Sequence, residues 1–465
     1  MKRLKTELNA LVNRGVDRHL RLAVTGLSRS GKTAFITALV NQLLNIHTGA
    51  RLPLLSAARE ERLLGVKRVP QRDFGIPRFT YDEGLAQLYG QPPMWPTPTR
   101  GVSEIRLALR YRSNDSLLRH FKDTSTLYLE IVDYPGEWLL DLPMLAQGYL
   151  SWSRQMTGLL QGQRAEWSAR WRQLCAGLDP LAPADEARLA DIAAAWTDYL
   201  HACKREGLHF IQPGRFVLPG EMAGAPALQF FPWPDVDAVG EAKLAQADKH
   251  SNAGMLRERY KYYCERVVKG FYKEHFLRFD RQIVLVDCLQ PLNSGPQAFN
   301  DMRLALTQLM QSFHYGQRTL FRRLFSPVID KLLFAATKAD HVTIDQHSNM
   351  VSLLQQLIQD AWQNAAFEGI SMDCLGLASI QATQSGLIEV NGEKIPALRG
   401  NRLSDGQPLT IYPGEVPARL PGQAFWQQQG FQFENFRPQV MDVDRPLPHI
   451  RLDAALEFLI GDKLR

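Results

Sequence analysis

The chain has 465 residues, of which 45% are hydrophobic and 22% are charged, and its net charge at pH 7 is +6. This is the composition of a globular protein of two or three domains with sizeable cores. So mild a positive charge, spread without a long basic run, gives no reason to expect nucleic-acid binding.

Two features of the sequence indicate the cytoplasm. The five cysteines include no C-x-x-C pair, which favours reduced thiols. The chain begins Met-Lys-Arg-Leu-Lys without the apolar stretch of a secretory signal, and no apolar run approaches the roughly 20 residues that span a bilayer. We therefore expect a cytoplasmic protein.

Residues 1–18 predict a basic amphipathic helix, with leucines on one face and lysines and arginines around them. Such a helix can lie on an anionic membrane surface or on a protein partner, and it can equally dock on its own domain. Peripheral contact with the inner membrane therefore stays open as an alternative.

The stretch from Gly26 to Thr33, Gly-Leu-Ser-Arg-Ser-Gly-Lys-Thr, fits the P-loop pattern G-x-x-x-x-G-K-[ST]. It lies between a strand-like run at 20–24 and a helix-forming run at 33–44, the context that this loop requires. The glycines let backbone N–H groups point at phosphate oxygens, the Lys32 ammonium reaches the β- and γ-phosphates, and the Thr33 hydroxyl can ligate Mg²⁺. The helix N-terminus adds its dipole. The phosphate-binding residues predicted here are Gly26, Ser28, Arg29, Ser30, Gly31, Lys32, Thr33 and Ala34.

A long polar connection follows at 51–98, with a helix predicted at 54–64. It ends in the proline-rich stretch 92–100, which cannot be helical because each proline removes a donor and restricts its predecessor. Residues 102–111 then alternate apolar and polar side chains, as a half-buried strand does.

The next predicted strand, 127–132, runs into Asp133-Tyr-Pro-Gly-Glu. A carboxylate at the end of a strand beside the P-loop strand is where an acidic residue holds the Mg²⁺ shell, and the Gly136 N–H can approach a γ-phosphate. Asp237-Ala-Val-Gly also matches D-x-x-G, but it follows Phe-Pro-Trp-Pro rather than a strand. We therefore predict a metal site only at Asp133.

Residues 138–279 form an insertion far longer than an ordinary loop, which implies a subdomain. Helical periodicity predicts helices at 139–174, 184–206 and 238–279, with an extended interruption at 211–234. The many tryptophans and phenylalanines of the insertion predict a second core.

Strands are predicted again at 281–287, 331–336 and 374–378, separated by helices at 296–315 and 349–366. Strands that alternate with helices predict a parallel α/β sheet, which binds ligands at the carboxyl ends of its strands. The last part, 387–445, is predicted to be β-rich, with a hairpin at Asn391-Gly392. A helix at 453–460 is expected to dock on the body.

The strand at 331–336 ends on Thr337-Lys338-Ala339-Asp340. The Asp340 carboxylate can accept hydrogen bonds from N1–H and the 2-amino group of guanine, which adenine cannot offer. The aliphatic part of Lys338 would pack over the base. This motif therefore predicts guanine rather than adenine.

The three motifs GLSRSGKT, DYPGE and TKAD, in this order, resemble the translation-factor-related (Ras-like) class of P-loop GTPases. Thr337 stands where that class usually has Asn. The resemblance implies GTP or GDP with Mg²⁺. It also implies an α/β fold: a P-loop NTPase (Ras-like G domain) with a large, mostly helical insertion and a β-rich C-terminal extension.

The same resemblance implies further residues at the nucleotide. A switch threonine that closes on Mg²⁺ should lie just before the strand at 102–111, where Thr99 is the first candidate and Thr97 the second. The fifth, base-contacting loop would fall at 379–382. The other residues expected at the nucleotide are Trp95, Arg100, Ser379 and Ile380.

Ras-like proteins orient the attacking water with a Gln at the position that Glu137 occupies here. Glu137 is therefore expected to position water, although a carboxylate beside a phosphate is repelled unless it is protonated or separated by that water. Arg29 or Arg100 would supply an arginine in cis. The repulsion between the Glu137 carboxylate and the phosphate predicts slow hydrolysis, and the catalytic residues expected are Lys32, Glu137 and Arg29.

Over nearly its full length the chain is similar to the bacterial YcjX-like family, most specifically at WPTPTR, DYPGEW and HIRLDAALEFLIGDKL. That family comprises stress-associated proteins with a P-loop GTPase core, so the similarity implies a cytoplasmic nucleotide switch with a protein partner of unknown identity. Two alternatives remain: a non-hydrolysing, nucleotide-gated module that binds a protein or membrane, and an ATPase or small-molecule kinase. The implied division is an N-terminal helix at 1–18, a GTPase core at 19–137 and 280–386, a helical insertion at 138–279, and an extension at 387–465.

Overall fold

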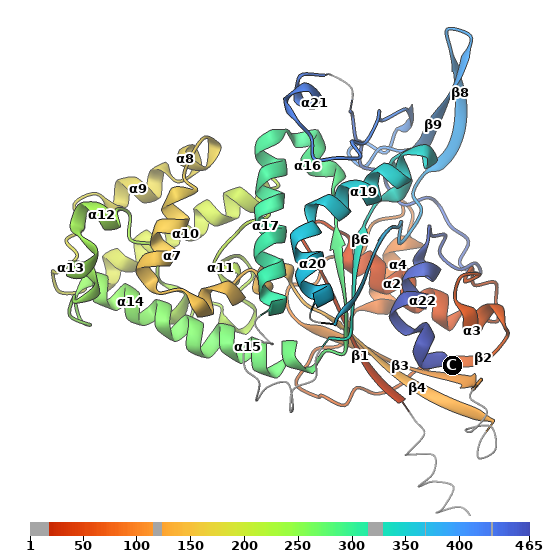
Figure 1. Cartoon of the computed structure of the whole chain (residues 1–465), viewed down its shortest axis with the longest axis horizontal. Coiled ribbons are helices and arrows are strands. Elements are labelled where there is room, and N and C mark those ends of the chain that lie inside the picture. Colours follow the sequence, from red (N-terminus) through yellow and green to blue (C-terminus); the bar gives the residue numbers. More distant parts are fainter. Residues whose placement is uncertain (1–17, 115–122, 315–328, 368, 429–430) are drawn as a thin grey trace, which may run out of the picture. The chain divides into compact units, whose positions relative to one another are not determined.

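The computed structural model describes residues 18–114, 123–314, 329–367, 369–428 and 431–465 (Figure 1). The helix predicted for residues 1–18 therefore lies outside the described residues, apart from Arg18, which begins the first strand. The chain divides into two compact units. Unit 1 comprises the described parts of Met1–Tyr134, Phe279–Pro296 and Val328–Arg465, and unit 2 those of Pro135–Arg278 and Gln297–Pro327.

Unit 1 is built on a seven-stranded sheet of order β2-β3-β4-β1-β5-β6-β7. The strands from β4 to β7 all pair in parallel, β3 is antiparallel to β4, and β2 is antiparallel to β3 at the edge (Figure 1). The predicted α/β class with a largely parallel sheet is confirmed. The strands are β1 (Arg18–Gly26), β2 (Leu63–Arg68), β3 (Ser103–Arg112), β4 (Thr124–Asp133), β5 (Arg281–Val286), β6 (Lys331–Ala336) and β7 (Ser371–Gly376).

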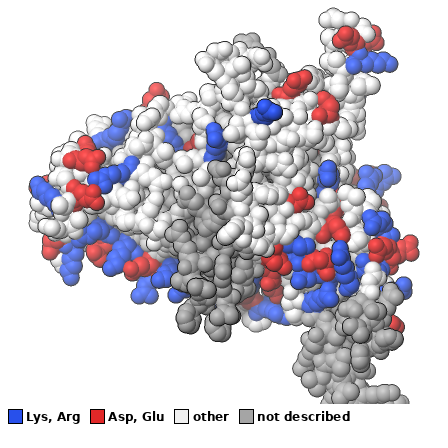
Figure 2. Space-filling view, in the orientation of Figure 1, with Lys and Arg blue, Asp and Glu red and all other residues white. Residues whose placement is uncertain are grey.

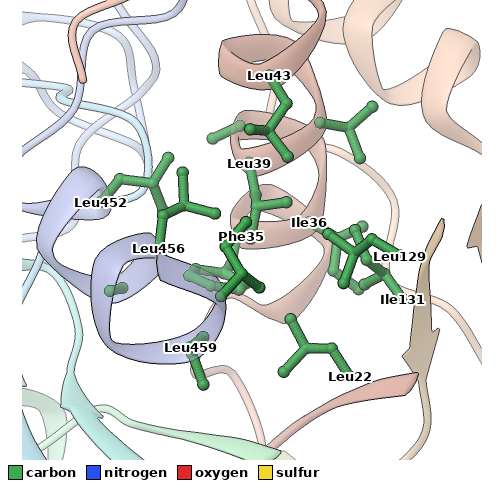
Figure 3. Packing of buried hydrophobic residues seen from close by; sticks show 14 of the residues in the cluster. Leu22, Phe35, Ile36, Leu39, Leu43, Leu129, Ile131, Leu452, Leu456 and Leu459 are labelled. Atoms are coloured by element: carbon green, nitrogen blue, oxygen red, sulfur yellow. The ribbon is translucent and has the colours of Figure 1, made fainter. Parts of the chain in front are cut away.

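The core of unit 1 lies between this sheet and two helices from opposite ends of the chain. Helix α2 (Lys32–Leu44) repeats apolar residues at helical spacing, and ten of its 13 residues are buried, so it is covered on nearly all sides. Helix α22 (Leu452–Ile460) covers the same cluster, which confirms that the C-terminal helix docks on the body (Figure 3). The labelled side chains in this cluster are Leu22, Phe35, Ile36, Leu39, Leu43, Leu129, Ile131, Leu452, Leu456 and Leu459.

Two helix predictions in unit 1 need correction. The helix predicted at 54–64 is only the single turn α3 (Ser56–Arg59), because Leu63 already begins β2 and pairs with β3. The helix predicted at 349–366 is divided at Ile358 into two helices. The other α-helices in the described part of unit 1 are α4 (Tyr81–Leu88), α16 (Leu289–Ser294), α19 (His347–Leu357), α20 (Gln359–Phe367) and α21 (Gln423–Gln427).

The C-terminal extension contains a separate antiparallel sheet of order β10-β9-β8. The predicted hairpin is confirmed: Asn391 and Gly392 join β8 to β9 with φ of 53° and 82°, as a tight Asn-Gly turn requires. The strands are β8 (Gln384–Val390), β9 (Glu393–Asn401) and β10 (Pro408–Ile411).

Unit 2 is helical and has its own aromatic core, as predicted, with Trp152, Trp171, Trp196 and Phe230 all buried. The prediction of one helix at 139–174 was wrong, because the helix is interrupted: Gly148 and Gly162 are the residues before the first turns of two separate helices. The helix predicted at 238–279 is likewise several segments. The main elements are α6 (Gly136–Leu139), α7 (Tyr149–Gly158), α8 (Gln163–Trp167), α9 (Ala169–Cys175), α10 (Glu186–Arg205), α11 (Gly214–Val217), α14 (Asn252–Tyr262), a π-helix η4 (Tyr263–Val268), α15 (Lys269–Glu274) and α17 (Pro296–His314).

The charged side chains, the cysteines and the longest helices were each the subject of a prediction from the sequence. Basic and acidic side chains are interspersed on the face that Figure 2 shows, as the mild net charge predicts. All five cysteines are buried free thiols. None of the helices in the described part of the chain is long and apolar enough to cross a membrane.

Candidate functional site

The carboxyl ends of the parallel strands meet at one edge of the seven-stranded sheet. Strand β1 ends at Gly26 and its neighbour β4 ends at Asp133, which stands opposite Val24. On the other side of β1, strands β5 and β6 end together, with Val286 opposite Ala336, directly before the TKAD motif. The three predicted motifs therefore follow strand ends at the edge where parallel sheets bind ligands.

The backbone of the P-loop needs glycine at both ends. A Cβ atom at Gly26 would lie 2.2 Å from Ser30 Oγ and 2.7 Å from the carbonyl oxygen of Leu285. Gly31, the N-cap of α2, has φ of 86° in the left-handed region. Helix α2 has no acidic residue in its first turn and no side-chain cap, so its N–H groups and the positive end of its dipole suit an anion.

The side chains of the loop differ in exposure. Ser30 and Thr33 are buried, and Ser30 Oγ has no hydrogen-bond partner among the described residues. Lys32 is half-buried, as are Ser28 and Ala34. Arg29 is exposed and has a left-handed backbone, with φ of 63°.

Asp133 has the character of a metal-shell residue. Its Oδ2 accepts a hydrogen bond from Thr99 Oγ1, whereas its Oδ1 is buried without a hydrogen-bond partner in the described chain. Burial raises the pKa of Asp133, and the charge of Lys32 opposes the rise. A buried, unpaired carboxylate oxygen is costly, and a divalent cation or a water molecule in its shell would satisfy it.

The donor set therefore fits Mg²⁺. Thr33, Thr99 and Asp133 offer oxygen atoms, the ligands that Mg²⁺ prefers, and Mg²⁺ usually completes its shell with water and phosphate oxygens rather than with a protein cage. The described residues contain no group of three or more His, Cys, Asp or Glu side chains that could hold a metal ion.

The segment before β3 separates its two threonine candidates. Thr99 contacts Asp133, while Thr97 exchanges two hydrogen bonds of 2.8 Å with Gln87 on α4. Trp95 is half-buried, and its Nε1 donates to the carbonyl oxygen of Phe436 at 2.8 Å. Arg100 is exposed.

Asp340 is buried at the end of the TKAD motif with its carboxylate already oriented. His341 Nδ1 lies 2.9 Å from Oδ1, and the Ala382 N–H donates to Oδ2 at 2.7 Å. Burial acts to raise the pKa of Asp340, but His341 and the hydrogen bonds from His341 and Ala382 outweigh it and hold the pKa below its usual range. A carboxylate has about four lone-pair sites, so two further bonds to guanine remain chemically available.

Lys338 is held by residues that the sequence motifs do not mark. Its Nζ lies 2.7 Å from Asp287 Oδ2 and donates to Asn435 Oδ1 at 3.2 Å. The same Nζ lies 5.3 Å from the centre of the Phe433 ring. Lys338 also has φ of 61°, a left-handed conformation that is costly for a residue with a Cβ.

The segment predicted as the fifth loop, 379–382, contacts Asp340 through its last residue, Ala382, and Thr383 directly after it makes a second contact. Ala382 bonds to the Asp340 carboxylate, and Thr383 Oγ1 donates to the Asp340 carbonyl oxygen. Ser379 is half-buried and Ile380 is buried in the same loop. Position alone could have suggested His341, which directly follows Asp340, and Asp287, which follows a strand. No local pattern could have suggested Phe433 and Asn435, the residues of the C-terminal extension that contact Lys338.

Gly136 and Glu137 begin α6 and belong to unit 2. Glu137 Oε1 accepts a hydrogen bond of 2.8 Å from Lys204 Nζ on α10, and its side chain is 7% exposed. Lys204 is 67 residues away along the chain, so no spacing signal connects the two. The predicted water-positioning residue is thus paired with a cation of the insertion.

Comparison with known proteins connects these motifs to a family. The model of the YcjX-like family, DUF463, matches residues 20–464. The Escherichia coli (strain K12) protein named Ras-like GTPase YcjX is 91% identical over 465 residues, all of both chains. The Shewanella oneidensis (strain MR-1) protein of the same name is 46% identical over 478 aligned positions, which cover 100% of this chain and 98% of that protein.

Proposed function

Since the chain belongs to the YcjX-like family, we propose that it is a GTPase that binds GTP and GDP with Mg²⁺ at the carboxyl edge of its sheet. Two relatives that it matches along its whole length carry the name Ras-like GTPase. The observation that supports the proposal most is the convergence of three motifs on one sheet edge, together with the unpaired Oδ1 of Asp133.

On the phosphate side, the N–H groups of the loop 26–34 and the Lys32 ammonium would bind the β- and γ-phosphates. Thr33 and Asp133 would hold Mg²⁺, and Thr99 would join them when GTP is bound. When bound, Mg²⁺ neutralises charge on the phosphate oxygens while the γ-phosphoryl group is transferred to water. Gly136 would direct its N–H toward the γ-phosphate.

On the base side, Asp340 would accept from N1–H and the 2-amino group of guanine, and Lys338 would pack over the ring. Thr337, Ser379 and Ile380 would border the base, and Trp95 would lie beside the nucleotide. Hydrogen bonds from His341 and Ala382 already hold the Asp340 carboxylate in one orientation, which lowers the cost of ordering it on binding.

For catalysis, Glu137 would accept a hydrogen bond from the attacking water, and Lys32 would stabilise charge on the transferred phosphate. The exposed Arg29 and Arg100 are the candidates for an arginine in cis. A carboxylate positions water less well than an amide beside a phosphate, so we propose slow hydrolysis. We also propose that the protein acts as a stress-associated cytoplasmic switch, with the insertion at 138–279 and the extension at 387–465 available to a protein partner.

A non-hydrolysing, nucleotide-gated module is the second candidate, and the observation that favours it is the buried Glu137 in place of the usual Gln. Single-turnover hydrolysis with purified protein separates the two candidates. We expect slow GTP hydrolysis that Glu137→Ala lowers further. Binding of GTP without any turnover would leave only the module, and equal affinity for ATP and GTP would contradict guanine specificity and favour an ATPase.

A further inference from the structure

The insertion supplies Glu137 with a charged partner. Lys204, near the end of α10, donates to Glu137 Oε1 at 2.8 Å, and the two side chains are 26% and 7% exposed. Water screens such a pair less than it screens a surface pair, so the attraction is stronger. The Glu137 carboxylate therefore points where Lys204 holds it.

Two more elements of unit 2 fix the backbone around Glu137. Gly214, which begins α11, lies so close that a Cβ there would be 2.2 Å from the Glu137 carbonyl oxygen. The Gly214 N–H donates to both carboxylate oxygens of Asp141, at 2.8 and 3.0 Å, and the Tyr263 hydroxyl donates to the same carboxylate at 2.5 Å. The turn from Glu137 to Asp141 is thus held at three places: the Glu137 side chain contacts Lys204, the Glu137 backbone packs on Gly214, and the Asp141 carboxylate accepts hydrogen bonds from Gly214 and Tyr263.

We propose that Lys204 is a positioning residue for GTP hydrolysis that acts through Glu137. The inference rests on the proposed function. Glu137 follows Asp133 by four positions, so the Cα atoms of the two residues can lie no more than roughly 15 Å apart. Lys204 exchanges no proton in this role: its ammonium balances the charge of the carboxylate and fixes its direction.

The chemical reason is charge. A lone carboxylate beside a γ-phosphate is repelled, whereas the Glu137–Lys204 pair carries no net charge. Paired in this way, Glu137 can accept a hydrogen bond from the attacking water without adding net negative charge to the site. The insertion would then compensate in cis for the missing Gln.

The test compares single-turnover GTP hydrolysis by the full-length wild type, Lys204→Met and Lys204→Arg, with Mg²⁺ and across pH. We expect Lys204→Met to lower the rate constant roughly 10- to 100-fold, the scale of a misplaced catalytic group, with GTP and GDP affinities unchanged. Lys204→Arg keeps the charge and should recover most of the rate. On the acid side, the rate of Lys204→Met should fall at a higher pH than that of wild type, because a carboxylate that loses a neighbouring positive charge is protonated more easily. A merely structural role would not move this limb.

Arg205→Met is the matched control, because Arg205 is the next residue on the same helix, is 71% exposed and pairs with Glu206. It should hydrolyse GTP at the wild-type rate. Adding Lys204→Met to Glu137→Gln should cost no further rate, since Lys204 acts through Glu137.

Three outcomes would overturn the inference. The first is a Lys204→Met rate equal to or above wild type, and the second is an unmoved acid limb. The third is a double variant, Glu137→Gln/Lys204→Met, whose loss of rate is the sum of the losses of the two single variants. The double variant leaves no unpaired buried carboxylate, so it replaces Lys204→Met in the test if that single variant misfolds. A wild type that binds GTP but never hydrolyses it contradicts the proposed hydrolysis as well, whereas the other outcomes leave it intact.

Discussion

At the scale of single residues, Thr97 and Thr99 show how one segment separates two similar side chains. Thr99 Oγ1 donates to the buried Asp133 carboxylate, while Thr97 is tied to Gln87 on the neighbouring helix. A threonine that already contacts the proposed metal-shell residue needs little movement to join a bound Mg²⁺. Thr97 would first have to give up two hydrogen bonds.

Thr99→Ala should therefore weaken Mg²⁺-dependent GTP binding roughly 10- to 150-fold, because a hydrogen bond to a charged group contributes about 1.5–3 kcal/mol. Thr97→Ala is its matched control and should bind GTP like wild type. Titration with a GTP analogue, with and without Mg²⁺, measures both. Equal effects of the two substitutions would contradict the assignment.

Asp141 makes the stability of unit 2 depend on pH. Burial raises its pKa to about 7, and hydrogen bonds from Tyr263 and Gly214 oppose the rise. The unfolded chain releases this proton near pH 4, so between about pH 4 and 7 the folded state binds more protons and stability falls as pH rises. Urea unfolding should show wild type losing about 2 kcal/mol more than Asp141→Asn between about pH 5 and 7.5. An identical pH dependence in the two proteins would refute this.

At the scale of elements, α11 packs against α6 through a glycine that has no room for a side chain. Gly214→Ala would place its Cβ 2.2 Å from the backbone of Glu137, so one of the two elements must move. We expect a loss of about 1–3 kcal/mol in the stability of unit 2. Gly158→Ala, at the end of α7 where a Cβ meets nothing within 4 Å, should be neutral or slightly stabilising. Chemical denaturation of both variants compares them, and equal stability would rule out the tight contact.

Elements with a strong local pattern were predictable from the sequence. The helix predicted at 184–206 is α10, because its apolar residues recur at helical spacing behind the Asp185 cap. The edge strand β2 was missed because only one of its six residues is buried and pairing with β3 is what makes them a strand. The breaks that divide 139–174 come from local turns that the averaged periodicity hides.

The residues of the candidate site also fall into those that the sequence predicts and those that it does not. The motif residues of the P-loop, Asp133 and Asp340 follow strand ends, so chain order and sheet topology bring them to one edge. The partners that orient them come from distant segments: Asn435 lies 97 positions from Lys338. Such contacts depend on the folded extension, and no local pattern encodes them.

At the scale of the whole molecule, the residues proposed for nucleotide binding and hydrolysis come from two units with separate cores. The nucleotide would bind to residues of unit 1, and ligand binding stabilises the folded state by about 2.7 kcal/mol at a concentration of 100 times Kd. GDP with Mg²⁺ should therefore slow hydrogen exchange most in α2 and β4, and less in helices of unit 2 such as α9. Uniform protection across both units would contradict a site built mainly from unit 1.

The most direct test of guanine-nucleotide binding at the sheet edge is a titration of wild type and Asp340→Asn with GDP and XDP. Wild type should prefer GDP, because its carboxylate accepts from the 2-amino group, and Asp340→Asn should prefer XDP, whose 2-oxo group accepts from the new amide. Glu434→Gln, at a half-buried side chain that makes no contact with Asp340, serves as a control that leaves the preference unchanged. Retention of the wild-type preference in Asp340→Asn would contradict the base site, and so would equal binding of GDP and ADP by wild type.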